Sequence, residues 1–224
     1  SARGRGDAGL PPGLGAVAVG WASRERASMA GVALPVRKLR GTEPRAALDL
    51  TDKGLGVASA VVIAKCIAVN GVLTSLNLAG NPFSSSDGIG PEGAKAIADA
   101  LRVNSVLTSL DLYANHLGVE GAKSIGQALK VNSVLTVLGL AGNQIGAEGA
   151  KAIGEAVCVN SVLTSLNLHC NEIGDQGAKA IAEAIKVNSV LKSLDLRLNG
   201  LGGGEAALRE IAKDRPSLTL KVKL

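Results

Sequence analysis

Aromatic residues are almost absent from this chain of 224 residues, which has one Trp (Trp21), one Tyr (Tyr113) and one Phe (Phe83). Since 46% of the residues are nonetheless hydrophobic, the core must consist of Leu, Ile, Val and Ala. This composition disfavours folds built around buried aromatic clusters. It also leaves few rings on which nucleic-acid bases could stack.

Cysteine, histidine and long apolar runs are scarce as well. Cys66, Cys158 and Cys170 form an odd set without a CxxC pair, which argues against a disulfide framework and a structural zinc site. No apolar run reaches the roughly 18 residues of a membrane helix, so we expect no transmembrane segment. His116 and His169 stand in no catalytic or metal-ligand spacing. We therefore expect no catalytic residues, no metal and no cofactor.

Positive charge is confined to the N-terminal part. Residues 1–40 hold seven basic and two acidic side chains, whereas residues 41–224 hold 17 of each, so the net charge of +5 lies wholly in the first part. A nucleic-acid-binding protein normally carries a basic field on its folded surface, so we expect no nucleic-acid partner. The basic, acid-poor segment fits an organelle-targeting remnant, a clipped terminus or a fragment boundary. We expect an intracellular protein, cytoplasmic or organellar.

A repeat of 28 residues dominates the rest of the chain. The sequence VNSVLT begins at Val103, Val131 and Val159, and VNSVLK begins at Val187. The first unit is longer by six residues, which fall within 82–88. Repetition of this kind is typical of a solenoid. We divide the chain into a basic Gly/Ala/Arg-rich arm (1–40), a degenerate N-terminal capping repeat (41–72), four repeats (73–190) and a C-terminal capping repeat (191–224).

Each unit predicts one short strand followed by one helix. Leu110 and Leu112 alternate with polar residues, as in a strand with one buried face. Residues 121–130 place small and apolar side chains on one helical stripe. Right-handed connections then give a parallel sheet with all helices on one side. Because helices are wider than the strand spacing, we predict an α/β solenoid, a short curved arc with the sheet on the concave face and helices on the convex face.

Two kinds of residue mark the turns. Glycines 118, 146 and 174 precede the helices, where a turn needs unusual backbone angles. The asparagines at 104, 132, 160 and 188 follow the last apolar turn of each helix, and Asn tolerates the left-handed conformation at that place. We therefore predict that these four asparagines end their helices in the left-handed region.

The motif LxxLxLxxN occurs at residues 107–115, 135–143 and 163–171, and it resembles the leucine-rich repeat. The 28-residue period is similar to the ribonuclease-inhibitor-like subclass, which also occurs in NOD-like receptors and Ran GTPase-activating proteins. The resemblance implies that the motif asparagines form a ladder between adjacent coils. Lys53 holds the equivalent place in the first copy, where the ladder is expected to fail. The ladder residues would be Asn81, Asn115, Asn143, Asn171 and Asn199.

Such proteins usually bind partners on the concave face, so the outward-facing strand positions are the candidate site. One row holds Asp111, Asn167 and Asp195, and the next row holds Tyr113, His169 and Arg197. Tyr and Arg are enriched at interface hot spots, although these rows would also suit a merely solvated face. In the insertion, Phe83 would anchor a partner if exposed, or otherwise cover the base of the insertion.

From these features we expect a non-enzymatic protein–protein interaction scaffold that binds an unidentified protein through its concave face or insertion loop. One alternative is a structural or assembly subunit of a larger, possibly organellar, complex, tethered by the basic arm. Another, implied only by the resemblance, is a GTPase-activating regulator of a small GTPase. A repeat fragment of a NOD-like receptor is a further alternative if the chain continues upstream.

Overall fold

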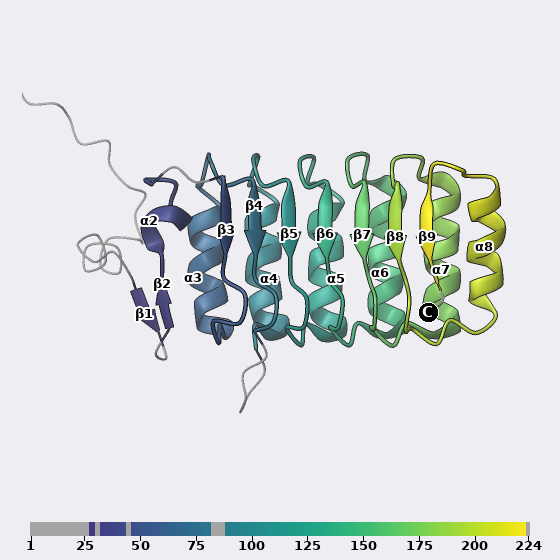
Figure 1. Cartoon of the computed structure of the whole chain (residues 1–224), viewed down its shortest axis with the longest axis horizontal. Coiled ribbons are helices and arrows are strands. Elements are labelled where there is room, and N and C mark those ends of the chain that lie inside the picture. Colours follow the sequence, from purple (N-terminus) through teal and green to yellow (C-terminus); the bar gives the residue numbers. More distant parts are fainter. Residues whose placement is uncertain (1–26, 30–31, 44–45, 82–87, 223–224) are drawn as a thin grey trace, which may run out of the picture.

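The structure is a computed structural model, and it describes residues 27–29, 32–43, 46–81 and 88–222 (Figure 1). In these residues short strands alternate with helices along one axis. The strands are β1 (Ala27–Met29), β2 (Val32–Leu34), β3 (Ala47–Asp49), β4 (Ser75–Asn77), β5 (Ser109–Asp111), β6 (Val137–Gly139), β7 (Ser165–Asn167), β8 (Ser193–Asp195) and β9 (Thr219–Lys221). The helices are α2 (Val36–Leu39), α3 (Val57–Ile67), α4 (Gly90–Leu101), α5 (Gly118–Leu129), α6 (Gly146–Val159), α7 (Gly174–Val187) and α8 (Gly204–Lys213).

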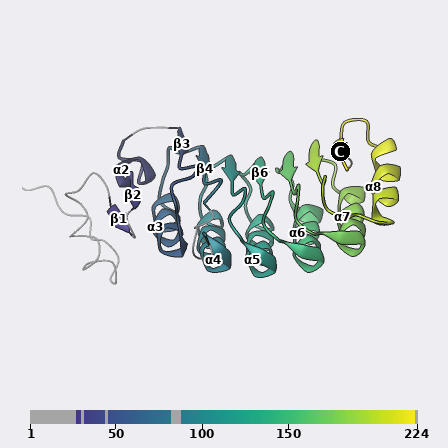
Figure 2. The ribbon, with the colours of Figure 1, turned by 60° about the horizontal axis from the view of Figure 1, so that its bottom comes forward.

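Strands β3 to β9 form one parallel sheet in sequence order. The register pairs the same repeat position in every coil, as where Leu110 lies opposite Leu76 and Leu138. Figure 2 shows the helices as a second layer on the outer side of a shallow arc. The predicted solenoid, with its sheet inside and its helices outside, is confirmed.

The core lies between the two layers and runs through all the coils. Leu110 and Leu112 of β5 and the following turn, and Ile125 and Leu129 of α5, are fully buried. Burying an aliphatic side chain of this size contributes about 1.5–3 kcal/mol. One strand and one helix cannot cover these side chains by themselves. Each coil therefore depends on its neighbours for burial.

From α3 to α8, neighbouring helices pack closely because the later helix of each pair places a glycine at the contact. At Gly149 of α6, an added Cβ would lie 2.9 Å from Cβ of Ala122 on α5 and 2.6 Å from Cγ2 of Ile145. Both distances are shorter than side chains tolerate, so only glycine fits. At Gly126 of α5, an added Cβ would lie 2.8 Å from the backbone oxygen of Ala152 on α6, so glycine there lets the two helices approach closely.

The motif asparagines are buried between coils and bond backbone groups on both sides. Asn143 Oδ1 accepts the backbone N–H of Asn115 at 2.9 Å, in the preceding coil. Asn143 Nδ2 donates to the carbonyl of Leu112 in that coil at 2.9 Å and to that of Leu140 in its own coil at 2.9 Å. Asn81, at the start, reaches the first coil by accepting the N–H of Lys53 at 2.9 Å.

A second set of asparagines performs the same task at the opposite edge, where the helices end. Asn160 Oδ1 accepts the backbone N–H of Leu163 at 2.7 Å, and its Nδ2 donates to the carbonyl of Leu129 in the preceding coil at 2.7 Å. The equivalent residues behave alike from coil to coil. They are Asn70, Asn104, Asn132 and Asn188.

The prediction that the asparagines after the helices are left-handed is wrong. Asn160 has φ −75° and ψ 125°, and Asn188 has φ −79° and ψ 117°, which are extended values. Their side chains, not an unusual backbone conformation, satisfy the groups at the helix end. The glycine prediction is confirmed, because Gly118, Gly146 and Gly174 have φ between 61° and 65°.

The folded part of the chain begins earlier than the predicted boundary at residue 41. Strands β1 and β2 form an antiparallel pair, and α2 follows. Leu34, Val36 and Leu39 are buried and belong to the common core. They cover the first coil, whose apolar side would otherwise face water. Asn70 Nδ2 fixes α2 by donating to the carbonyl of Leu39 at 2.8 Å.

The other end is closed by β9 and α8. Arg215, which follows α8, donates to the carbonyl of Ile185 at 2.7 Å and to that of Leu191 at 2.9 Å. The Ile185 carbonyl is the equivalent of the Val157 carbonyl, to which Asn188 Nδ2 donates in the preceding coil. Arg215 therefore takes over the bonding at the edge where the repeats stop.

Among the described residues, no helix is long and apolar enough to cross a membrane.

We predict that Asn143→Ala lowers the free energy of unfolding by about 2–4 kcal/mol, because buried backbone groups in two coils lose their partners. Urea unfolding followed by circular dichroism measures the change. Gln144→Ala is the matched control, since Gln144 is exposed. Its φ is 55°, and alanine, like glutamine, has a Cβ, so the substitution changes the backbone strain little. Equal stability of the two variants would contradict the structural role of the asparagine.

Candidate binding surface on the concave face

The concave face is lined by strand side chains that point away from the helices. In the row of Asp111, Asn167 and Asp195, each side-chain oxygen accepts the backbone N–H two residues later. For Asp111 and Asn167 the distances are 2.9 and 3.1 Å. One oxygen of each side chain is therefore committed to the turn after the strand. This hydrogen bond fixes the orientation of each of the three side chains and leaves its second polar atom without a role in the turn.

Tyr113 is the largest side chain of the next row and is 48% exposed. Its ring lies beside Gly142 of the following coil, where an added Cβ would be 3.3 Å from Cε2. Strand β6 beside it carries no side chain at Gly139, where the Asp111 carboxylate takes up the space instead: an added Cβ would lie 2.5 Å from Asp111 Oδ1. Ala141 is buried. Tyr113 thus borders a strip of the sheet without large side chains, which we call the β6 strip (Gly139 and Ala141).

His169 stands on the far side of the β6 strip from Tyr113. It follows β7 in the same row and is partly exposed. Strands in a sheet are about 4.8 Å apart, so the two side chains originate about 10 Å from each other. The structure therefore places Tyr113 and His169 on either side of the β6 strip, over which the Asp111 carboxylate also lies. Phe83, the other aromatic candidate, lies outside the described residues.

Arg197 and Asp195 bind each other at the C-terminal end of this face. The guanidinium donates through Nε to Oδ1 at 3.0 Å and through Nη2 to Oδ2 at 2.6 Å. Burial of Asp195 acts to raise its pKa, but the hydrogen bonds from Arg197 outweigh burial and hold the pKa below its usual value. Asp195 is only 8% exposed, so a partner would contact it little. Its main effect on docking would be to hold the Arg197 guanidinium in place.

Charges on the concave face are not evenly distributed. Asp49 and Asp111 lie on the strands of the N-terminal half, whereas Lys221 lies on β9 and Arg197 follows β8; Lys192 is exposed just before β8, at the edge of the face. Sequence reasoning missed Lys192 and Lys221. Lys192 occupies the position that is threonine in the other repeats, and that substitution was the available signal.

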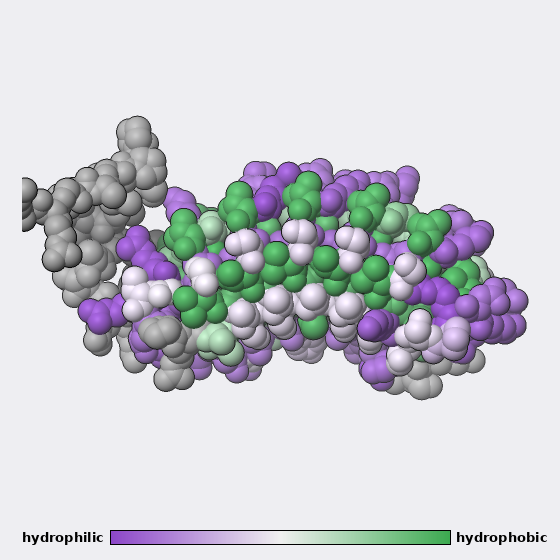
Figure 3. Space-filling model, turned by 90° about the horizontal axis from the view of Figure 1, so that it is seen from above, coloured by the Kyte–Doolittle hydropathy of each residue, from purple (hydrophilic) through white to green (hydrophobic). Residues whose placement is uncertain are grey.

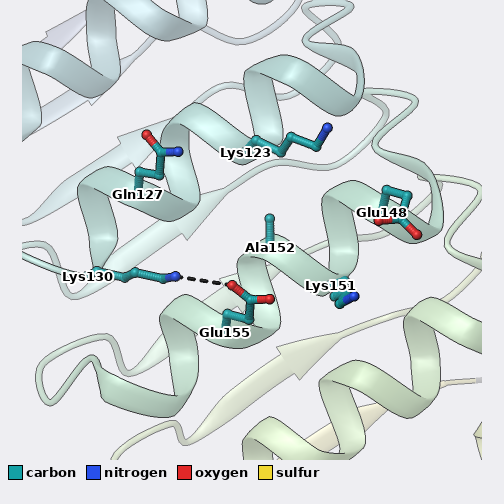
Figure 4. Close-up of a pocket in the computed structure, with 7 residues that line it drawn as sticks. All are labelled: Lys123, Gln127, Lys130, Glu148, Lys151, Ala152 and Glu155. Carbon is teal, nitrogen blue, oxygen red and sulfur yellow. Dashed lines mark hydrogen bonds and ion pairs between the residues drawn. The ribbon is translucent and has the colours of Figure 1, made fainter.

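The convex side offers a shallow hollow between α5 and α6 (Figure 4). Its volume is about 260 Å³, and charged side chains line most of it. Lys130 Nζ crosses it to Glu155 Oε2 at 3.1 Å. Sites for small organic molecules are usually larger and mostly apolar, so this hollow does not have the character of one.

The described residues hold no cluster of three or more His, Cys, Asp or Glu side chains that could bind a metal ion. Cys66 is buried, and burial raises the pKa of its thiol, so the reactive thiolate form is disfavoured. Cys158 and Cys170 are exposed.

The fold and the repeated asparagine bonds define a solenoid of strand–helix coils. Comparison with protein families identifies the family of these coils. The family model described as "Leucine Rich repeat" matches residues 69–98, 103–126, 131–154, 159–182 and 187–204. The chain belongs to the leucine-rich-repeat family, with repeats of the ribonuclease-inhibitor-like subclass. No curated protein sequence matches the chain.

Solved structures with the same architecture include a domain described as leiomodin-1 actin-binding site 2. It is 25% identical, has a TM-score of 0.57, and the match covers 71% of this chain and 92% of that one. The tropomodulin C-terminal domain of Caenorhabditis elegans is 13% identical (TM-score 0.54; 70% and 91% covered) and shows the fold alone. The leucine-rich-repeat protein LegL7 of Legionella pneumophila is 25% identical (TM-score 0.55); the match covers 82% of this chain and 58% of LegL7.

We predict that the ion pair of Asp195 and Arg197 makes stability depend on pH. The pKa of Asp195 is lower in the folded chain than in the unfolded one, so the pair stabilises the fold above about pH 4 and this gain is lost as the pH falls further. Arg197→Ala should therefore be less stable than the wild type at pH 7, and the difference should shrink towards pH 3.

Urea unfolding at several pH values measures this difference. Arg102→Ala serves as the control for the loss of one positive charge, since Arg102 pairs with Asp99 at 3.8 Å and both are exposed. A stability difference for Arg197→Ala that stays constant from pH 7 to pH 3 would contradict the role of the pair.

Proposed function

We propose that this leucine-rich-repeat domain is a non-enzymatic module that binds a protein partner on its concave face. The observation that carries the proposal is the half-exposed Tyr113 beside the β6 strip. A rigid aromatic side chain next to small residues and the Asp111 carboxylate gives a partner both an anchor and a polar contact. A face of this kind suits a protein surface better than a small molecule, which needs a concave pocket.

The uneven charge of the face supports one orientation of the partner. Basic groups of the partner would lie over Asp49 and Asp111, and acidic groups would lie near Lys192 and Lys221. Complementary charges of this kind steer encounter and fix orientation more than they add affinity. Arg197 is already paired with Asp195, so it would contribute through its exposed guanidinium edge.

Actin is the first partner to test. The leiomodin-1 domain, whose name states an actin-binding site, matches this chain over 92% of its own length at 25% identity. This likeness does not depend on the concave side chains, so actin binding is a candidate separate from the choice of face.

We predict that Tyr113→Ala combined with His169→Ala weakens partner binding at least tenfold without lowering the melting temperature, since Tyr113 is half-exposed, His169 is partly exposed and both lie outside the core. A photo-crosslinking amino acid at position 113 identifies the partner in cell extract, and binding to the purified partner is then measured. Gln127→Ala combined with Lys95→Ala on the convex side is the matched control. Unchanged affinity of the concave variant would move the site away from this face.

For actin, we predict that the purified domain binds actin with a measurable dissociation constant in fluorescence titration. The Tyr113 and His169 variant then locates the actin site: at least tenfold weaker binding than that of the convex control would place actin on the concave face, and equal binding would place it on another face. The wild-type domain is tested at concentrations up to about 100-fold above those used for the crosslinked partner. If it does not bind actin there, actin is removed as the candidate, and the concave-face proposal stays intact.

A further inference from the structure

The concave face differs in character from the neighbouring edge of the solenoid. Most exposed valines of the described chain lie at that edge, where the helices end and the strands begin, and Figure 3 shows it from above with its lines of hydrophobic side chains. On the concave face, short polar side chains such as Ser109 and Asn167 occupy most of the outward-facing strand positions. A partner on this face would therefore be selected mainly by hydrogen bonds and charge.

The Asp111 carboxylate is a fixed negative group near the middle of this face. Its Oδ1 accepts the backbone N–H of Tyr113 at 2.9 Å, which sets the orientation of the carboxylate. No hydrogen bond or ion pair from the described residues reaches its Oδ2. Asp111 is half-buried and lies over Gly139 of the next strand. One of its oxygens is thus held in the turn, and the other is open to a donor from outside.

The coil of β8 shows what a carboxylate at this position binds. Asp195 holds the same place in the sheet register as Asp111, and its Oδ1 likewise accepts the backbone N–H two residues later. In that coil the residue two positions on is Arg197, whose guanidinium bonds both oxygens of Asp195. In the coil of β5 the equivalent residue is Tyr113. This coil therefore has the carboxylate of the pair without the guanidinium.

Tyr113 and Asp111 lean towards the same neighbouring coil. The Tyr113 ring lies beside Gly142, as the carboxylate lies over Gly139, and Ala141 between these two glycines is buried. Residues two apart along a strand are about 7 Å from each other, so one planar cation between the ring and the carboxylate can contact both. A guanidinium can stack on an aromatic ring while its N–H groups, which lie in its own plane, donate to a carboxylate.

We propose that Asp111 and Tyr113 bind one arginine side chain of the protein partner, with its guanidinium on Asp111 Oδ2 and against the Tyr113 ring. We call this pair of residues the arginine subsite. The inference rests on the proposed function of the concave face and adds the chemistry by which the partner is recognised. Arginine fits better than lysine, because the ammonium group of lysine is not planar and does not offer two parallel donors.

A fluorine label on Tyr113 tests the arginine subsite directly, since Tyr113 is the only tyrosine of the chain. The full chain made with fluorotyrosine gives one fluorine NMR signal, which is followed during titration with Nα-acetyl-arginine amide. The signal should shift and saturate, with a dissociation constant in the millimolar range that is expected for so small a ligand. Nα-acetyl-citrulline amide, which has nearly the same shape but no charge, should bind at least tenfold more weakly.

Asp111→Asn removes the charge but keeps the turn. Asn77 and Asn167 hold the same repeat position, and the Oδ1 of each accepts the equivalent backbone N–H, so the variant should fold and keep its melting temperature. It should bind acetyl-arginine amide at least tenfold more weakly than the wild type. Asp99→Asn is the matched control, because it makes the same change of charge at an exposed residue of the convex helix α4. It should bind like the wild type.

Four results would overturn the arginine subsite. The first is a Tyr113 signal that the arginine and citrulline amides shift equally, or that acetyl-arginine amide leaves unchanged up to about 100 mM, far above the expected dissociation constant. The second is equal binding by Asp111→Asn and the wild type, and the third is equally tight binding of Nα-acetyl-lysine amide. The fourth is a response that appears only after the four arginines of residues 1–26 are changed to glutamine, which would assign the subsite to the chain's own N-terminal part.

The partner separates the arginine subsite from the proposed function. The partner identified by crosslinking at position 113 should bind Asp111→Asn at least tenfold more weakly than Asp99→Asn. If Tyr113→Ala with His169→Ala weakens partner binding but Asp111→Asn does not, the concave face remains the binding site and the arginine subsite is wrong. If neither variant weakens partner binding, both proposals are wrong.

Discussion

The structure depends on hydrogen bonding of backbone groups that the repeated coils bury at their two edges. Wherever the chain turns from strand to helix or from helix to strand, N–H and C=O groups are buried without a sheet or helix partner of their own. An asparagine amide, which can donate and accept at once, bonds both its own coil and the preceding one. Leucine burial drives the coils together, but the two asparagine ladders fix their spacing.

The repeated elements could be predicted from the sequence because each one recurs several times with the same period. Leu110 and Leu112 marked a strand with one buried face, and Gly118 marked a turn that needs positive φ. The ends were harder to predict. Leu34, Val36 and Leu39 belong to the core but follow no repeat pattern, and their burial depends on a neighbouring coil that local sequence does not reveal.

The second asparagine ladder shows where local reasoning failed. Asn160 follows a helix, and single-residue preference suggested a left-handed helix end. Its side chain instead bonds Leu129 in the preceding coil, which is a contact between residues 31 positions apart. For the candidate site, the rows of the concave face followed from strand alternation, whereas the pairing of Arg197 with Asp195 and the contact of Tyr113 with Gly142 depended on side-chain geometry.

Hydrogen exchange at single amides tests the central claim most directly. The N–H groups of Asn115 and Leu117 are bonded to Oδ1 of Asn143, in the next coil, at 2.9 and 3.4 Å. These two amides lie in a loop, yet they should exchange as slowly as amides of the buried helices, only through unfolding of the coil stack. Exchange at the rate of an open loop would contradict the account.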